Sequence, residues 1–303
     1  MLGRALGSVA SRYSGAPGED LAKIAPDGGL VPGNFARRLR EGPLALSLEI
    51  TPPKTMLPGV LSRRATLLGG AVDAINVIQR PGRVPSLDAS IALLQQDIDP
   101  VWHLVTRGRT RDEIATDLAR AREAGLRNAL CILGDHVPEH HVDSPTVREV
   151  VSMAHQALPG GLIGATFNQY APGREKALLN LRRKCEAGAT YVQTQPAFDP
   201  DAFAEVARWL HSELPGVAIV PMVIPLLSTN AVDRIESRLG IEVPGELRRV
   251  VAAGEESAWA GFERIVGGLI ASGEVQGLAI MTFEMDPPQG TAERIVRALR
   301  RTA

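Results

Sequence analysis

The sequence has few cysteines, few aromatic side chains and no excess of charge of either sign. Two cysteines among 303 residues are too few for a disulfide framework in a chain of this size, which favours a reducing compartment. The 33 basic and 34 acidic residues give a net charge of -1, and no block of like charge is long enough to neutralise a nucleic-acid backbone. We therefore exclude nucleic acid as a main partner.

The sequence also lacks an apolar run as long as a membrane span or a signal peptide. Residues 1–13 contain arginines and no acidic residue, which is compatible with a transit peptide. We treat the transit peptide as the weaker alternative. The simplest interpretation is a cytoplasmic protein that makes no membrane contact. Residues 1–40 are rich in Gly, Ala, Pro and Arg and are predicted to form an N-terminal extension, and residues 41–303 a single catalytic domain. The oligomeric state is not predicted by the sequence.

What the sequence does contain is a repeated alternation of short apolar runs and helical segments. The apolar runs lie at about 45–51, 72–78, 101–106, 128–133, 162–167, 190–195, 217–224 and 276–283. Segments with helical spacing lie between them, for example 111–124, 175–187 and 201–214. Strands that alternate with helices pair in parallel through right-handed crossovers. Eight such units in about 260 residues are typical of an α/β fold of the (β/α)8 TIM barrel type.

Two details refine this prediction. Residues 228–272 are longer than one crossover requires, so extra helices are predicted between strands seven and eight. The competing topology, a doubly wound open sheet, usually has a glycine-rich turn after its first strand, where this sequence has Thr-Pro-Pro-Lys at 51–54. The pattern therefore favours the barrel.

A carboxylate lies near the end of the first predicted strand. Because side chains of a strand point alternately to its two faces, Glu49 lies on the same face as Ala45 and Ser47 in the run 45–50. The opposite face has the three large aliphatic side chains Leu46, Leu48 and Ile50. An ionised carboxylate in a buried position costs several kcal/mol unless it is paired or neutralised. Glu49 is therefore a candidate proton donor, and the alternative is a structural acid paired with a lysine or arginine.

Other polar side chains follow the predicted carboxyl ends of the strands, where barrels place their active sites. They are Asn76, Gln79, His103, Asp135, Asn168, Gln193, Gln195 and Glu284. Structural roles are the alternatives: a hydrogen-bonded core histidine at His103, a turn at Asp135, and mutual hydrogen bonds of the two glutamines. Three histidines in 136–141 lie with Asp135 and Asp143 in one predicted loop with no ligand helix behind them, so no metal site is predicted.

The combined pattern resembles the methylenetetrahydrofolate reductase family, (β/α)8 enzymes that reduce a folate-borne methylene group to methyl with electrons from NAD(P)H through FAD. The resemblance covers about residues 44–300. It is carried by Ser-Leu-Glu-Ile-Thr-Pro-Pro (47–53), His103-Leu104, Leu133-Gly134-Asp135, the stretch Leu178 to Lys184, Thr194-Gln195 and Phe198-Asp199.

The resemblance implies roles for several of these residues. Glu49 corresponds to the general acid that protonates the folate amine as the five-membered ring opens. Asp135 corresponds to the acid that contacts the pterin, and Gln195 to an amide that binds it, with Gln193 and Phe198 as further predicted substrate contacts. The implied activity is reduction of 5,10-methylenetetrahydrofolate to 5-methyltetrahydrofolate, which supplies methyl groups for methionine synthesis.

The sequence departs from the family at the flavin contacts. Ile78-Gln79-Arg80 replaces a Thr-Tyr-Gly turn, and Leu133, Phe167, Ala171 and Ala177 replace polar or aromatic partners. Each lost hydrogen bond is worth about 1 kcal/mol, so several losses weaken binding by orders of magnitude. FAD is therefore predicted to bind weakly or not at all, and the hydride to pass directly from NADH or NADPH.

The cofactor contacts that remain predicted are His103, Asn76, Gln79, Phe167, Asn180, Arg183 and Lys184. The sequence does not separate NADH from NADPH, because it has no fingerprint for the ribose. Two alternatives from other classes stay open: a folate-binding or regulatory protein that has lost redox activity, and another barrel enzyme of one-carbon metabolism such as a pterin-dependent methyltransferase.

Overall fold

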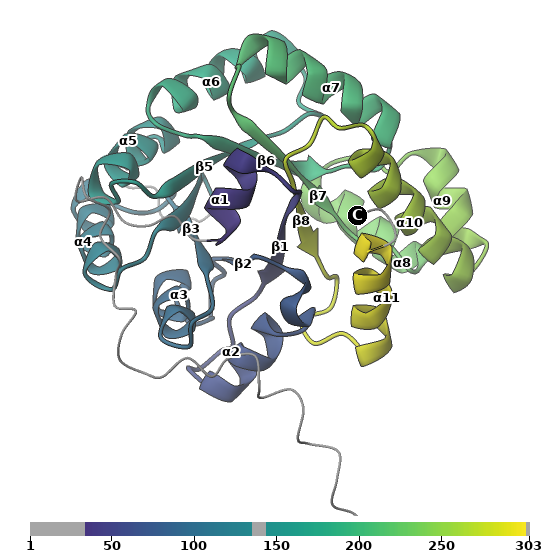
Figure 1. Cartoon of the computed structure of the whole chain (residues 1–303), viewed down its shortest axis with the longest axis horizontal. Helices are drawn as coiled ribbons and strands as arrows, with labels where there is room; N and C mark the ends of the chain where they lie inside the picture. The colour runs from purple at the N-terminus through teal and green to yellow at the C-terminus, as the bar shows by residue number, and fades with distance from the viewer. Residues whose placement is uncertain (1–33, 135–143, 301–303) are drawn as a thin grey trace, which may run out of the picture.

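Eight parallel strands form a closed barrel in a computed structural model that describes residues 34–134 and 144–300 (Figure 1). The strands are β1 Ala45–Ile50, β2 Ala74–Val77, β3 Pro100–Val105, β4 Asn128–Ile132, β5 Leu162–Phe167, β6 Tyr191–Pro196, β7 Ala218–Val223 and β8 Gly277–Met281. Each strand pairs with the next one in sequence, and β8 closes on β1, with Glu49 opposite Met281. The predicted TIM barrel is confirmed.

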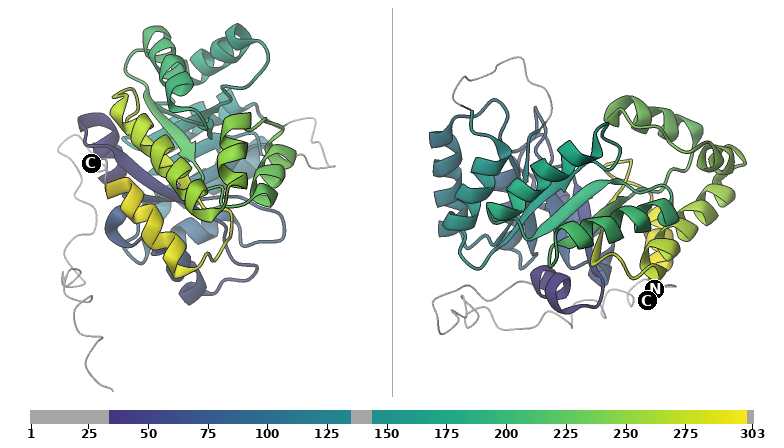
Figure 2. Two further views of the ribbon diagram at one scale, coloured as in Figure 1. Left: turned by 90° about the vertical axis from the view of Figure 1, so that its right-hand side faces the viewer. Right: turned by 90° about the horizontal axis from the view of Figure 1, so that it is seen from above.

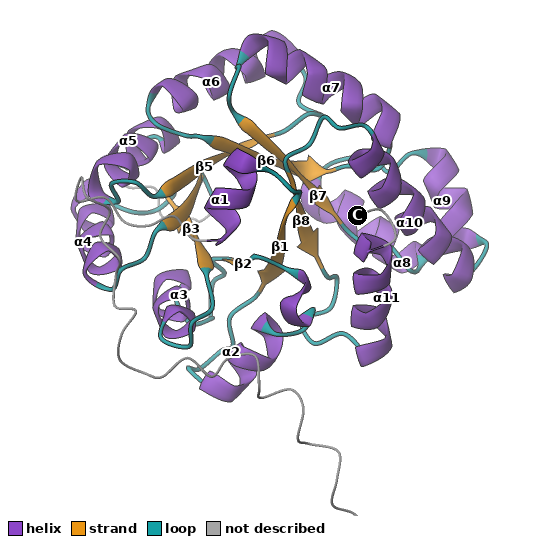
Figure 3. Cartoon of the chain, in the orientation of Figure 1, coloured by secondary structure: helices purple, strands orange, loops and turns teal. Residues whose placement is uncertain are grey.

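Helices surround the barrel, as the colouring by secondary structure makes clear (Figure 3). They are α1 Asn34–Glu41, α2 Pro58–Ala65, α3 Ser86–Leu94, α4 Arg111–Glu123, α5 Val147–Ala157, α6 Arg174–Glu186, α7 Pro200–Glu213, α8 Thr229–Leu239, α9 Gly245–Ala252, α10 Glu255–Ala271 and α11 Gln289–Arg300. Helices α8, α9 and α10 are the extra helices predicted between strands seven and eight. Within the described ranges, no helix is both long and apolar enough to cross a membrane.

Successive side chains along each strand contribute in turn to two hydrophobic clusters. Outward-facing side chains such as Leu48, Ile75 and Trp102 pack against the helices in one large apolar cluster. Inward-facing side chains such as Ala74, Val101 and Leu130 form a smaller second cluster inside the barrel. The lumen is therefore a packed interior rather than a pore, as expected for eight strands.

Helix α1 closes the amino-terminal end of the barrel and lies against that end in the right-hand view of Figure 2. Phe35 of α1 meets Tyr191 of β6 edge to face, with ring centroids 6.2 Å apart and an interplanar angle of 89°. Gly164 on β5 leaves room for Tyr191, because a Cβ at this position would lie 2.2 Å from the tyrosine ring. Although α1 falls mostly within the predicted extension, it packs into the barrel's core and leaves the carboxyl end for polar groups.

Candidate active site

Glu49 of β1 lies on the lumen side of its strand, in the alternation of Ala45 and Ser47. Burial raises the pKa of its carboxyl group from 4.5 to about 7, and the positive charge of Arg238 on α8 opposes this shift. Within residues 34–134 and 144–300, no hydrogen bond or ion pair engages the carboxylate. The acid can therefore carry a proton near neutral pH, and it is not a structural acid locked to a cation.

A buried polar layer lies next to Glu49, whose neighbour on β2 is Asn76. The Asn76 amide donates to the Ser47 hydroxyl at 3.1 Å and, across the lumen, to the Gln193 side-chain oxygen on β6 at 3.2 Å. All three side chains are buried, and the oxygen Oδ1 of Asn76 has no partner among the described residues. These bonds tie β1, β2 and β6 into a fixed polar floor, one alternation above Tyr191.

His103 on β3 is 5% exposed, and its Nε2 has no hydrogen-bond partner in the described part of the chain. Burial lowers the pKa of its imidazole to about 4, so the ring is neutral at pH 7. A buried nitrogen without a partner costs roughly 1–3 kcal/mol. The hydrogen bond that the structural alternative requires is therefore missing at Nε2 among the described residues.

The end of β6 is held by the loop that follows β5. Gln169 donates to the backbone oxygen of Gln195 at 2.9 Å and accepts from its backbone nitrogen at 3.1 Å. The Tyr170 hydroxyl donates to the Pro196 carbonyl at 2.7 Å. The Tyr170 ring stacks on that of Phe198, with the ring centroids 6.3 Å apart. Gln169 and Tyr170 were not predicted as site residues. An amide and an aromatic side chain directly after strand five could have indicated that they lie at the barrel mouth.

A second group missed from the sequence encloses Glu49. The cavity beside Glu49 measures about 40 Å³, and its lining includes Arg80, Arg238 and Phe283. Its wall also includes Arg64 of α2, which is 8% exposed and donates to the Thr51 carbonyl at 2.8 Å.

Arg64 also pairs with Asp286 of the loop after β8 at 2.6 Å, and hydrogen bonds from Arg64 hold the pKa of Asp286 down at about 2. One guanidinium thus fixes both the end of β1 and the loop after β8.

We expect Arg64→Ala to lower the free energy of unfolding by about 2–3 kcal/mol, because it leaves the Thr51 carbonyl and Asp286 without their buried partner. Chemical denaturation measures the loss. Arg63→Ala is the matched control, since Arg63 pairs with the same Asp286 but its side chain is 65% exposed. Equal effects of the two substitutions would contradict the anchoring role of Arg64.

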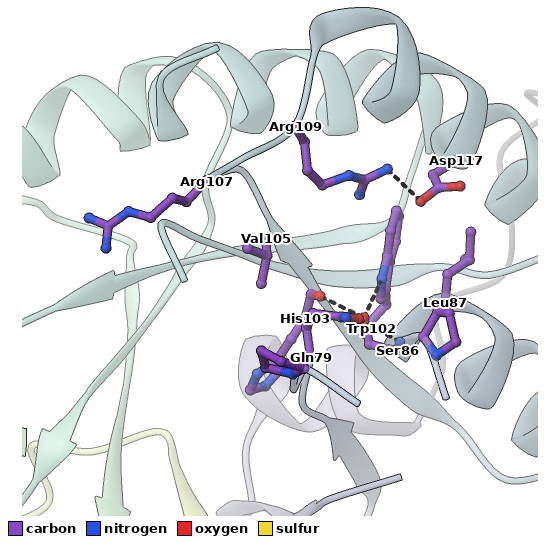
Figure 4. Close-up of a pocket in the computed structure, with 11 residues that line it drawn as sticks. Gln79, Ser86, Leu87, Trp102, His103, Val105, Arg107, Arg109 and Asp117 are labelled. Atoms are coloured by element: carbon purple, nitrogen blue, oxygen red, sulfur yellow. Dashed lines mark hydrogen bonds and ion pairs between the residues drawn. The ribbon is translucent and has the colours of Figure 1, made fainter. Parts of the chain in front are cut away.

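A larger cavity, of about 360 Å³, lies between the carboxyl ends of β2 and β3 and helices α3 and α4 (Figure 4). We call it the side pocket. Its lining residues are Gln79, Pro81, Pro85, Ser86, Leu87, Trp102, His103, Val105, Arg107, Arg109 and Asp117. Gln79 is fixed by a 2.8 Å hydrogen bond that its side-chain oxygen accepts from the backbone nitrogen of Ser86. Arg109 pairs with Asp117 at 2.7 Å.

Of the seven residues predicted to contact a cofactor, only Gln79 and His103 line the side pocket. Asn76 lies in the polar layer beside Glu49, and the other four lie elsewhere. Phe167 faces outward, with its ring 6.4 Å from Trp209 of α7. The Lys184 ammonium already donates to the Thr166 carbonyl at 3.0 Å, and Asn180 and Arg183 are exposed on α6. Of these four residues, Phe167 has no hydrogen-bonding side chain and turns away from the lumen, whereas Asn180 and Arg183 remain exposed to solvent.

Asp135 lies outside the described residues, and so does the loop of histidines that follows it. Within residues 34–134 and 144–300, no group of three or more His, Cys, Asp or Glu side chains is placed to hold a metal ion. The residues that the structure does bring together around the barrel mouth are Glu49, Asn76, His103, Gln193 and Gln195, with Gln79 at the rim.

The sequence is similar to that of known proteins of one family. A family model described as methylenetetrahydrofolate reductase matches residues 34–287. The probable methylenetetrahydrofolate reductase (NADPH) of Caenorhabditis elegans is 24% identical over 217 residues, which cover 65% of this chain and 33% of that protein. The 5,10-methylenetetrahydrofolate reductase of Escherichia coli (strain K12) is 23% identical over 180 residues, which cover 58% of this chain and 60% of that protein. The chain thus spans less than two thirds of either relative.

A solved structure shares the fold. It is an uncharacterized protein from Clostridium thermocellum that binds two copies of 5-methyl-5,6,7,8-tetrahydrofolic acid. The TM-score is 0.63 at 14% sequence identity, over 88% of this chain and 97% of that one. At this identity the likeness shows a common barrel.

Proposed function

The chain belongs to the methylenetetrahydrofolate reductase family, and we propose that it reduces 5,10-methylenetetrahydrofolate to 5-methyltetrahydrofolate with a reduced nicotinamide as the electron donor. The observation that carries this proposal is Glu49, a partly buried acid on the lumen face of β1 that has no ion-pair partner among the described residues and whose pKa is raised to about 7 by burial. The folate bound by the Clostridium thermocellum protein is the product of this reaction. The proposed setting is the cytoplasm, and the methyl group formed would serve methionine synthesis.

The proposed chemistry begins with a proton. Glu49 protonates the nitrogen N10 of the folate as the bond between N10 and the methylene carbon breaks, which leaves an iminium ion at N5. The nicotinamide then delivers a hydride to the methylene carbon, so the carbon gains two electrons and the nicotinamide is oxidised. Solvent returns a proton to Glu49. Gln195 and, by the family resemblance, Asp135 hold the pterin, and a carboxylate near it also stabilises the cationic intermediate.

Substrate reaches Glu49 only if the side chains above it move. The 40 Å³ cavity is smaller than a pterin, and Arg80, Arg238 and Phe283 are among the residues that line it. Arg238 is exposed, and Phe283 is covered by the Arg234 guanidinium, 4.3 Å from its ring centroid. Long surface side chains of this kind rotate on a fast timescale. Entry through these side chains therefore requires no change in the barrel.

We propose that the hydride passes directly from the nicotinamide to the substrate without a bound flavin. An iminium carbon is electrophilic enough to accept a hydride, so the protein has to supply orientation above all. The support is the loss of the family's flavin contacts at Ile78, Leu133, Phe167, Ala171 and Ala177, together with the outward position of Phe167.

An absorbance experiment tests both levels of the proposal. We expect the purified protein to show no flavin bands, and to oxidise NADH or NADPH only after 5,10-methylenetetrahydrofolate is added, with one 5-methyltetrahydrofolate formed per nicotinamide consumed. Stoichiometric FAD would overturn direct transfer but leave the reductase activity intact. No oxidation of either donor would favour the alternative of a folate-binding protein.

A further inference from the structure

The side pocket has the form of a binding site rather than a packing defect. Its walls are largely apolar, from Pro81, Pro85, Leu87 and Val105, and would contact the two faces of a flat ring. At about 360 Å³ it falls at the lower end of the range for small-molecule sites, enough for one nucleoside. Polar groups are present only at a few points of the wall.

An independent observation also points to a ligand. His103 lines the pocket, and its Nε2, which is itself buried, has no hydrogen-bond partner among the described residues. Gln79 is exposed, and because its side-chain oxygen accepts from Ser86, its side-chain nitrogen is a donor at the rim of the pocket. A buried nitrogen that the protein leaves unpaired is ordinarily satisfied by water or a ligand, as we infer for His103.

The place of the pocket decides which part of a ligand can enter it. His103 on β3 lies two strand spacings, about 10 Å, from Glu49 on β1. Two of its walls come from α3 and α4, outside the strands. A ring bound there is too far from Glu49 to exchange a hydride with a substrate at that acid. Only a part of the electron donor that does not react can occupy it.

The charges at its outer side suit a diphosphate and a ribose. Arg107 is paired with no carboxylate among residues 34–134 and 144–300, and in Figure 4 its side chain extends away from Arg109 and Asp117. The Arg109–Asp117 pair presents both hydrogen-bond donors and acceptors. An unpaired guanidinium next to an apolar pocket is a suitable partner for phosphate oxygens.

We propose that the side pocket binds the adenosine end of the nicotinamide dinucleotide. Arg107 contacts the diphosphate, and the nicotinamide end extends into the barrel mouth toward Glu49. The inference deepens the proposed function and rests on it. It also gives the protein a dinucleotide site that uses α3 and α4 rather than α6.

Comparison of whole and truncated donors tests the proposal. NADH is compared with reduced nicotinamide mononucleotide, which lacks the adenosine end, and the binding of ADP-ribose is measured by calorimetry. We expect kcat/KM to be at least about tenfold higher with NADH, and ADP-ribose to bind and to compete with NADH. Leu87→Trp, which fills the pocket, should abolish ADP-ribose binding and bring the two donors to similar kcat/KM values. Arg107→Gln should raise the KM for NADH by about tenfold.

Arg111→Gln is the control, because Arg111 is a nearby arginine that pairs with Glu149 on the surface and does not line the pocket. If Leu87→Trp fails to fold, Arg107→Gln and the truncated donor still decide the question. Equal kcat/KM for the two donors, or no binding of ADP-ribose to the wild-type protein, would overturn the pocket assignment while leaving the reductase proposal standing. If the wild-type protein binds ADP-ribose but oxidises no NADH, the reductase proposal is overturned and the pocket assignment stands.

Discussion

Glu49→Gln is expected to lower kcat for the reduction of 5,10-methylenetetrahydrofolate by roughly two to four orders of magnitude. Glutamine has nearly the shape of a protonated glutamate but cannot give up a proton to N10, so the iminium ion forms only by the uncatalysed route. Binding of 5-methyltetrahydrofolate should change little, because the amide keeps the volume and polarity of the acid. Steady-state nicotinamide oxidation measures the first effect and calorimetry the second.

Glu284→Gln is the matched control for this substitution. Glu284 lines the same cavity and loses the same charge, but it is an exposed side chain of the loop after β8. We expect its kcat to remain within about threefold of the wild-type value, because this carboxylate stands on an exposed loop at the edge of the cavity and not on the lumen face of a strand. Turnover of Glu49→Gln at a comparable level would remove Glu49 from the role of proton donor.

The barrel could be predicted because its strands are short, apolar and separated by helical spacing. Residues 162–167 were predicted as a strand and form β5 over the same range, and 228–272 contain the extra helices. The contribution of α1 could not be predicted in the same way. Phe35 and Leu39 lie at the end of a segment rich in Gly, Ala, Pro and Arg, a composition that does not predict a place in a hydrophobic core. Tyr191, which lies in the same apolar cluster, is distant in sequence. Only the folded barrel shows that they share a core.

The candidate site divides along the same line. Asn76, His103 and Gln193 were identified because they are polar side chains near the predicted carboxyl ends of strands, and in the structure they lie on the inward face of those strands. Phe167 shows the opposite case, since the same alternation places Leu162 inside and Phe167 outside, and the family resemblance had overridden it. Arg64 could not be found, because it reaches the site from a helix through contacts remote in sequence.

Glu49→Gln should also make the protein more stable, and increasingly so as the pH rises. The pKa of Glu49 rises from 4.5 unfolded to about 7 folded, because burial disfavours the charged form. The stability associated with the protonated acid is therefore fully present below pH 4.5 and is lost as the pH rises through about 7. Glutamine does not titrate, so the mutant avoids this loss.

We expect the mutant's excess in unfolding free energy to grow from less than about 1 kcal/mol at pH 5 to about 3 kcal/mol at pH 8. Denaturant titrations of both proteins over this range give the difference directly, and other raised groups such as Asp99 cancel because both chains contain them. A mutant whose stability runs parallel to the wild type across the range would mean that Glu49 is as well solvated as a surface acid. The proton that the reduction requires would then not be held there at neutral pH.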